Sequence, residues 1–180
     1  QRVYWTDNRN PVRVINIAAD YFSTDASFYN LSRDVAFTKL DIDDVTNGGN
    51  LECGVYQYVY RFKSNEGSIT RFSQPSNFVH VVNGSKYWEY EEDPENQTEY
   101  NGRDVGEITN RKVEIQINPV AQSYNELEGY DLVEVVAIYR TASTGYTTIA
   151  IIDEQSIPSS GKINIVHSTN ENNIPISIEE

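Results

Sequence analysis

Residues 54–82 read Gly-Val-Tyr-Gln-Tyr-Val-Tyr-Arg-Phe-Lys-Ser-Asn-Glu-Gly-Ser-Ile-Thr-Arg-Phe-Ser-Gln-Pro-Ser-Asn-Phe-Val-His-Val-Val. Every second residue from Tyr56 to Phe62 is aromatic, a period that places four rings on one face of a β-strand. We expect these rings to be buried against a second sheet. The sequence Asn-Glu-Gly at 65–67 is typical of a turn, and a second extended run follows it. The stretch therefore predicts an antiparallel strand pair, and it contains no obvious catalytic group.

Runs of the same kind recur along the chain, between turns rich in Gly, Asn and Ser. They predict strands at residues 3–5, 13–17, 36–42, 55–63, 69–73, 78–82, 112–117, 132–141, 147–153 and 162–168. The run 132–141 is largely apolar at both parities, which predicts a central strand. No window carries a sustained helical stripe. We therefore predict an all-β fold, an antiparallel β-sandwich.

The composition excludes several classes of protein. The 180 residues carry a formal net charge of −13, which disfavours binding to nucleic acid or to anionic membranes, because both need clustered Lys and Arg. No stretch approaches the roughly 18 apolar residues of a membrane span. Cys53 is the single cysteine, so an internal disulfide is excluded, and we expect its side chain to be buried. The chain has no methionine, and we interpret it as a piece of a longer polypeptide.

Three segments are expected along the chain. Residues 1–34 form an N-terminal extended segment, residues 35–170 form the β-sandwich with an excursion at about 84–111, and residues 171–180 form a C-terminal tail or linker. The sequence Tyr-Trp-Thr-Asp at 4–7 matches the blade motif of YWTD propellers. A second interpretation of the first segment is therefore the end of an upstream propeller-like domain, although one copy of the motif does not make a propeller.

Residues 86–104 interrupt the strand pattern with a polar, acidic and aromatic loop. Loops of this length are usually functional or mobile, and Trp and Tyr are the side chains that most often anchor protein interfaces. We therefore predict partner contacts at Tyr87, Trp88, Tyr90, Glu91, Glu92 and Tyr100.

No metal site is predicted. Asp41, Asp43 and Glu52 stand at positions one, three and twelve of a calcium-loop count. Val45 and Thr46, however, occupy the positions where an oxygen ligand and a glycine are needed. We interpret this acidic run as a solvated strand end with a glycine turn.

No catalytic residue or cofactor is predicted either. His80 and His167 each lie in a predicted strand without a second His or Cys nearby in sequence, so we expect strand-face residues rather than metal ligands. The carboxylates of the acidic loop lack the fixed separation of a glycosidase pair. No Ser-His-Asp spacing, phosphate-binding glycine loop or zinc pattern occurs.

Two parts of the chain resemble the fibronectin type III repeat. Its opening half is matched by Val-Glu-Ile-Gln-Ile-Asn-Pro (113–119), Gly-Tyr-Asp-Leu-Val-Glu-Val-Val-Ala-Ile-Tyr-Arg-Thr (129–141) and Gly-Tyr-Thr-Thr-Ile-Ala-Ile-Ile (145–152). Its closing hairpin is matched by residues 54–82. Because the closing-type hairpin comes first, the order fits either one immunoglobulin-like sandwich with shuffled strands or parts of two. The resemblance implies a fold and says almost nothing about function.

A closer match covers residues 3 to about 155. It is carried by Val-Tyr-Trp-Thr-Asp-Asn-Arg-Asn-Pro-Val-Arg-Val-Ile-Asn-Ile (3–17), Gly-Val-Tyr-Gln-Tyr-Val-Tyr-Arg-Phe (54–62) and Thr-Arg-Phe-Ser-Gln-Pro-Ser-Asn (70–77). These segments resemble the large tail stabilization or muzzle proteins of crAss-like and related phages of Bacteroidota. The chain departs from that pattern at Asn8, which replaces a glycine, and at Gln74 and Pro75 in the serine–proline turn. The resemblance implies an architectural role at the tail nozzle and no catalytic residues.

Two functions are consistent with these patterns. The first is a non-enzymatic structural component of a phage virion tail or neck, which packs against other tail proteins and copies of itself. The alternative is a carbohydrate- or receptor-binding module of a phage fibre or bacterial surface protein, located extracellularly or at the cell surface. In that case a glycan would stack on Tyr87, Trp88, Tyr90 and Tyr100.

Overall fold

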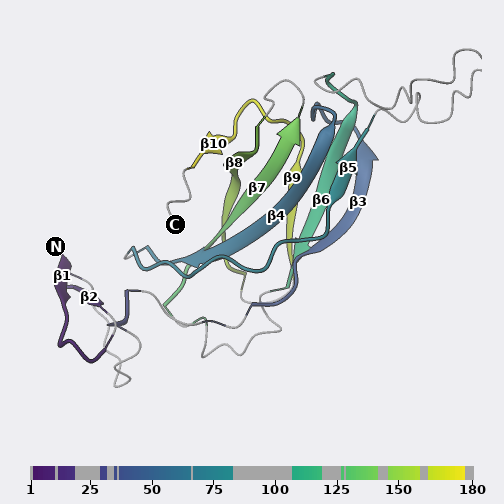
Figure 1. Cartoon of the computed structure of the whole chain (residues 1–180). Coiled ribbons are helices and arrows are strands. Elements are labelled where there is room, and N and C mark those ends of the chain that lie inside the picture. Colours follow the sequence, from purple (N-terminus) through teal and green to yellow (C-terminus); the bar gives the residue numbers. More distant parts are fainter. Residues whose placement is uncertain are drawn as a thin grey trace, which may run out of the picture.

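The computed structural model describes residues 2–10, 12–18, 29–31, 35, 37–65, 67–82, 107–118, 127, 129–141, 146–158 and 162–176. These residues contain ten strands, β1 to β10, in three sheets whose paired strands all run antiparallel (Figure 1). Across these ranges no helix has the length and apolar character that crossing a membrane requires.

The larger sheet has five strands in the order β10-β8-β7-β4-β5. Their bounds are Gly54–Lys63 for β4, Val79–Val81 for β5, Leu132–Thr141 for β7, Thr148–Ser156 for β8 and Ile174–Pro175 for β10. β7 pairs with β4 along its whole length and with β8 on its other edge. The predicted central position of this strand is therefore confirmed.

The smaller sheet has three strands in the order β3-β6-β9. Their bounds are Asp41–Asn47 for β3, Arg111–Ile117 for β6 and Ile163–His167 for β9. An irregularity in the pairing interrupts β3 between Ile42 and Asp44. A bulge of this kind bends an edge strand and hinders its extension into a longer sheet.

The two sheets pack face to face around one core. Tyr56, Tyr58, Tyr60 and Phe62 of β4 are each 0% exposed. They share the core with buried side chains of β6 and β9, namely Val113, Ile115, Ile117, Ile163 and Ile165. Burial of a large apolar side chain stabilises a fold by roughly 1.5–3 kcal/mol, so the aromatic face of β4 contributes much of the driving force. The predicted antiparallel sandwich is confirmed, as is the burial of Cys53.

Residues 68–76 run along an edge of β4 without forming a regular strand. Three hydroxyl residues at every third position each face one residue of β4: Thr70 faces Phe62, Ser73 faces Tyr60 and Ser76 faces Tyr58. In each pair the backbone N–H of the hydroxyl residue donates to the β4 carbonyl at 2.8–3.0 Å. The hydroxyl oxygen accepts the β4 backbone N–H at 2.9–3.0 Å. The strand predicted at 69–73 is therefore wrong, because this segment meets β4 with a period of three instead of two.

The strand predicted at 36–42 begins later, at Asp41. Thr38 uses its side chain and backbone for other contacts. Its hydroxyl donates to the Asn118 carbonyl at 3.1 Å, and its carbonyl accepts the Tyr60 hydroxyl at 2.7 Å. Because of these contacts, Thr38 is held by Asn118 and Tyr60 and does not pair with a neighbouring strand.

The pairing of β4 with β7 also decides between two interpretations of the sequence. The segments that resemble the opening and closing parts of a fibronectin type III repeat lie in one sheet, because β4 belongs to the closing part and β7 to the opening part. They are therefore parts of one sandwich and not of two. A closer relation to the fibronectin type III fold stays a prediction.

Candidate interaction surface

The partner-contact residues predicted from the sequence all lie outside the described residues: Tyr87, Trp88, Tyr90, Glu91, Glu92 and Tyr100. Their contacts stay a prediction. The described part of the chain presents a different candidate surface, at residues 2–17, which we call the N-terminal hairpin.

The N-terminal hairpin consists of β1 (Arg2–Trp5) and β2 (Arg13–Asn16). The two strands form a sheet of their own, beyond one end of the sandwich (Figure 1). An isolated two-stranded hairpin is at best marginally stable in water. Its stability therefore depends on contacts outside its two strands.

Among the described residues, hydrogen bonds connect the N-terminal hairpin to the sandwich directly and through Leu31. Leu31 N–H donates to the Val12 carbonyl at 2.8 Å, and Ile69 N–H donates to the Leu31 carbonyl at 3.3 Å. Arg2 Nη2 donates to the Asn65 carbonyl at 3.0 Å. These bonds use mainly backbone groups, and they leave five large apolar side chains of the hairpin exposed, whereas Val14 of β2 is buried.

The N-terminal hairpin exposes several large apolar side chains. Eleven large apolar side chains are exposed in the described part of the molecule, and five of these belong to the hairpin: Val3, Tyr4, Trp5, Val12 and Ile17. All four residues of β1 are exposed, so apolar groups face outward on both sides of that strand. Exposed apolar side chains that gather in one place are typical of an interaction surface.

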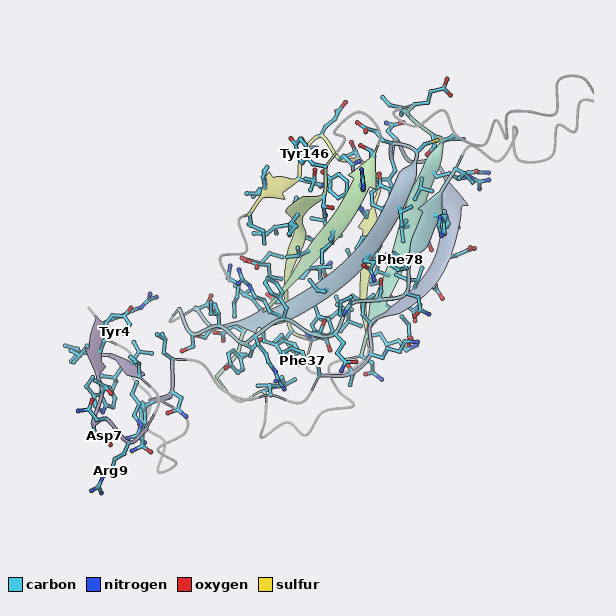
Figure 2. The ribbon with its side chains drawn as sticks, viewed as in Figure 1. Tyr4, Asp7, Arg9, Phe37, Phe78 and Tyr146 are labelled. Carbon is cyan, nitrogen blue, oxygen red and sulfur yellow. The ribbon has the colours of Figure 1, made fainter. Side chains whose placement is uncertain are left out.

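Asp7 holds the turn of the hairpin. Its Oδ1 accepts the backbone N–H groups of Asn10 and Arg9 at 2.8 and 3.0 Å, and its Oδ2 accepts the Asn10 side-chain amide at 2.6 Å. These bonds, led by the one from the Asn10 backbone, lower the pKa of Asp7 to about 2. Asn8 has a φ of 60°, in the left-handed region that favours Gly and Asn. The turn thus directs Arg9 away from the sandwich (Figure 2).

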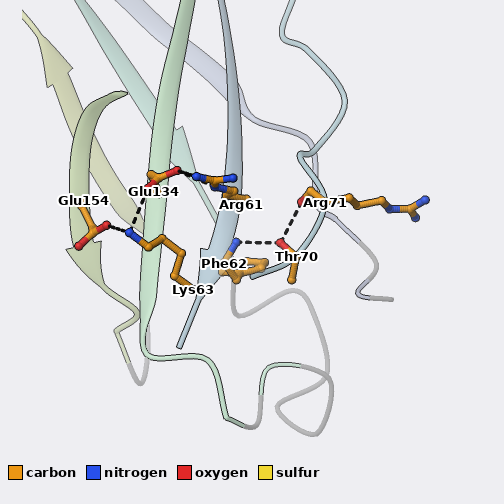
Figure 3. Close-up of polar contacts among 7 residues, drawn as sticks. All are labelled: Arg61, Phe62, Lys63, Thr70, Arg71, Glu134 and Glu154. Atoms are coloured by element: carbon orange, nitrogen blue, oxygen red, sulfur yellow. Dashed lines mark hydrogen bonds and ion pairs between the residues drawn. The ribbon is translucent and has the colours of Figure 1, made fainter. Parts of the chain in front are cut away.

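The outward face of the larger sheet carries a paired charge cluster (Figure 3). Glu134 of β7 is 1% exposed, accepts a hydrogen bond from Arg61 Nε at 2.6 Å and lies 3.1 Å from Lys63 Nζ. Lys63 also binds Glu154 of β8, and this bond is the main cause that raises the pKa of Lys63. The Arg61 guanidinium lies 4.7 Å from the ring centroid of Phe72. The cluster connects three strands, and each of its charges has a partner of opposite sign.

His167 lies in the core at the end of β9 and is 2% exposed. Its Nδ1 is 3.1 Å from the Tyr58 hydroxyl and its Nε2 is 3.1 Å from Asn173 Nδ2. Burial lowers the pKa of His167 to about 4, so the ring is neutral at pH 7. His80 lies exposed in β5. Both histidines are strand residues, as predicted, and within the described ranges no group of three His, Cys, Asp or Glu side chains is placed to hold a metal ion.

The model of the Crassvirus muzzle protein family matches residues 1–180, the whole chain. The chain belongs to this family. A curated relative, the muzzle protein of Bacteroides phage crAss001, is 25% identical over 150 residues. These residues make up 83% of this chain and 9% of the relative, so the chain spans less than a tenth of that protein's length. No solved structure matches the chain significantly. The resemblance to muzzle proteins predicted from the sequence is confirmed.

The exposed hairpin of this muzzle-family chain was not predicted as an interaction surface. Its two strands were predicted at 3–5 and 13–17, but their exposure depends on which other elements pack against them. One signal was present in the sequence, because Val3, Tyr4 and Trp5 are consecutive. A strand made from three consecutive apolar residues presents apolar side chains on both faces, and all three stay exposed in this small separate sheet.

Proposed function

We propose that the chain is a non-enzymatic structural part of a phage virion, located in the tail or neck, that packs against other tail proteins and copies of itself. Membership of the Crassvirus muzzle protein family supports this proposal, as does the relative that is itself named a muzzle protein. The same membership supports a location in the virion.

The observation that carries the proposal is the apolar surface of the N-terminal hairpin. Tyr4 is 54% exposed and Ile17 is 61% exposed. They belong to the N-terminal hairpin, whose two-stranded sheet is too small to be stable by itself. The aromatic side chains of β4, in contrast, are buried in the core. A protein that works by packing against neighbours needs exposed apolar side chains, such as those of the hairpin, on a stable body, such as the sandwich.

The domain organisation that we propose assigns residues 1–34 to a segment that contacts neighbours and residues 35–170 to the sandwich, with an excursion at about 84–111. The separate sheet of β1 and β2 supports the first boundary. Residues 171–180 follow as a tail, from which β10 adds a short edge strand to the larger sheet.

Mass spectrometry and immunogold labelling of purified virions test the proposal. We expect peptides of this chain in the particles and gold at the tail. Absence of the chain from purified virions would contradict the proposal. Strong binding on a glycan array that is lost on Trp88→Ala would also contradict it, because that result supports the carbohydrate-binding alternative.

A further inference from the structure

The N-terminal hairpin is basic, whereas the rest of the chain is acidic. Residues 1–17 contain Arg2, Arg9 and Arg13 but a single acid, Asp7, so their net charge is +2. The whole chain carries −13, which leaves −15 on residues 18–180. Two surfaces of opposite charge on the same protein favour contact between copies in one orientation, because like surfaces repel one another.

Arg9 is well placed for such a contact. Its side chain has no hydrogen-bond or ion-pair partner among the residues that the structure describes, and it points outward at the tip of the hairpin (Figure 2). Tyr4 and Ile17 add exposed apolar area on the same element. The hairpin therefore combines a free positive charge with apolar side chains, which matches the composition of interface residues.

Strand β3 has the complementary properties. It is an edge strand of the smaller sheet, and it exposes Asp41, Asp43 and Asp44. None of these carboxylates pairs with a cation in the described part of the chain. The carboxylates of Glu114 and Glu154, in contrast, are already paired with lysines. The acidic side chains of β3 are thus free to meet a cation from outside.

We propose that the N-terminal hairpin of one copy docks on β3 of a second copy, with Arg9 facing the aspartates. This inference rests on the proposed function and names the partner of its exposed hairpin. Within one copy the hairpin lies beyond one end of the sandwich and apart from β3, so the contact joins two copies (Figure 1). A contact between two different surfaces is heterologous, and it closes into a ring when the rotation between copies allows.

Exchange of the two charges tests this contact. We expect sedimentation velocity of the purified chain to show association that rises with protein concentration. Arg9→Glu and Asp43→Lys are each expected to weaken it by about tenfold or more, because each places like charges together. The chain with both substitutions is expected to recover the association, since the two charges again have opposite sign.

Two substitutions at exposed positions control for net charge. Arg140→Glu, on β7, changes the net charge by the same amount as Arg9→Glu, and Glu171→Lys, in the turn before β10, matches Asp43→Lys. Both controls are expected to leave the association unchanged. A control that weakens association as much as its partner substitution would overturn the proposal, because net charge alone would then explain the effect.

Three further results would overturn the docking proposal. They are a chain that stays monomeric at every concentration, an Arg9→Glu variant that associates normally, and a double variant that associates no better than the single ones. None of these results contradicts the proposed place in the virion, since that is tested on purified particles. Absence of the chain from purified virions would in turn not change the result of the sedimentation experiment.

Discussion

The hydroxyls of Thr70, Ser73 and Ser76 replace the carbonyl oxygens that a neighbouring strand would supply to β4. Each accepts a buried backbone N–H and donates its own hydrogen to the carbonyl of the residue that follows it. A side chain without an oxygen cannot do this, so the residue type at each third position is constrained by backbone hydrogen bonding and not by packing.

We expect Ser73→Ala to lower the free energy of unfolding by about 1–3 kcal/mol, because it leaves the buried N–H of Tyr60 without an acceptor. Urea denaturation followed by fluorescence measures the change. Thr147→Ala removes an exposed hydroxyl and is expected to change stability by less than about 0.5 kcal/mol. Equal effects of the two substitutions would contradict the role given to the Ser73 hydroxyl.

His167 gives the fold a defined pH dependence. Burial lowers its pKa from 6.5 to about 4, so between these values the unfolded chain binds more protons than the folded one. The contribution of the neutral His167 ring to the free energy of unfolding is complete above pH 6.5 and is lost as the pH falls toward 4. We expect this loss to be roughly 3 kcal/mol, since one pKa unit corresponds to about 1.4 kcal/mol.

His167→Asn isolates this contribution, because the carboxylates titrate alike in both chains. Urea denaturation at pH 7 and at pH 4.5 is expected to show a smaller loss of stability for the variant than for the native chain. The same loss in both chains would mean that the imidazole does not carry this pH dependence.

At the scale of single elements, the N-terminal hairpin depends on the left-handed residue in its turn. Asn8→Gly keeps this conformation accessible, whereas Asn8→Val introduces a β-branched side chain at a positive φ. We expect the valine variant to lose about 1 kcal/mol of local stability and to exchange the amide hydrogens of β1 about fivefold faster. Hydrogen exchange measured by NMR tests this, and equal exchange in the glycine and valine variants would contradict it.

Most strands could be predicted from the sequence because their side chains alternate between two environments. The period of two along residues 56–62 predicted the buried face of β4, and the apolar character of both faces of 132–141 predicted an interior strand. The segment 69–73 was predicted wrongly, because its contacts with β4 use hydroxyl groups that no hydrophobic pattern records. β10 was missed because two residues carry too little pattern to detect.

The interaction surface was less predictable than the strands. The sequence drew attention to aromatic residues in the 86–104 loop, which lies outside the described residues. The exposure of Tyr4 depends on how the other elements pack around the two-stranded sheet of β1 and β2, and this is a property of the tertiary arrangement. The difference in net charge between residues 1–17 and the rest of the chain can be counted from the sequence. It indicates an interaction surface only when the structure shows that residues 2–17 form a separate element.

At the scale of the whole molecule, the sandwich carries a basic hairpin with exposed apolar side chains beyond one end and an acidic edge strand in its smaller sheet. The paired charges of Glu134 and the aromatic core stabilise the body, and neither requires a ligand.

Cryo-electron microscopy of the intact virion tests this account most directly. We predict that the tail contains density for the sandwich, with the apolar side chains of residues 2–17 buried against a neighbouring subunit. A tail without this sandwich, or a sandwich whose N-terminal hairpin faces solvent in the assembled particle, would contradict the account.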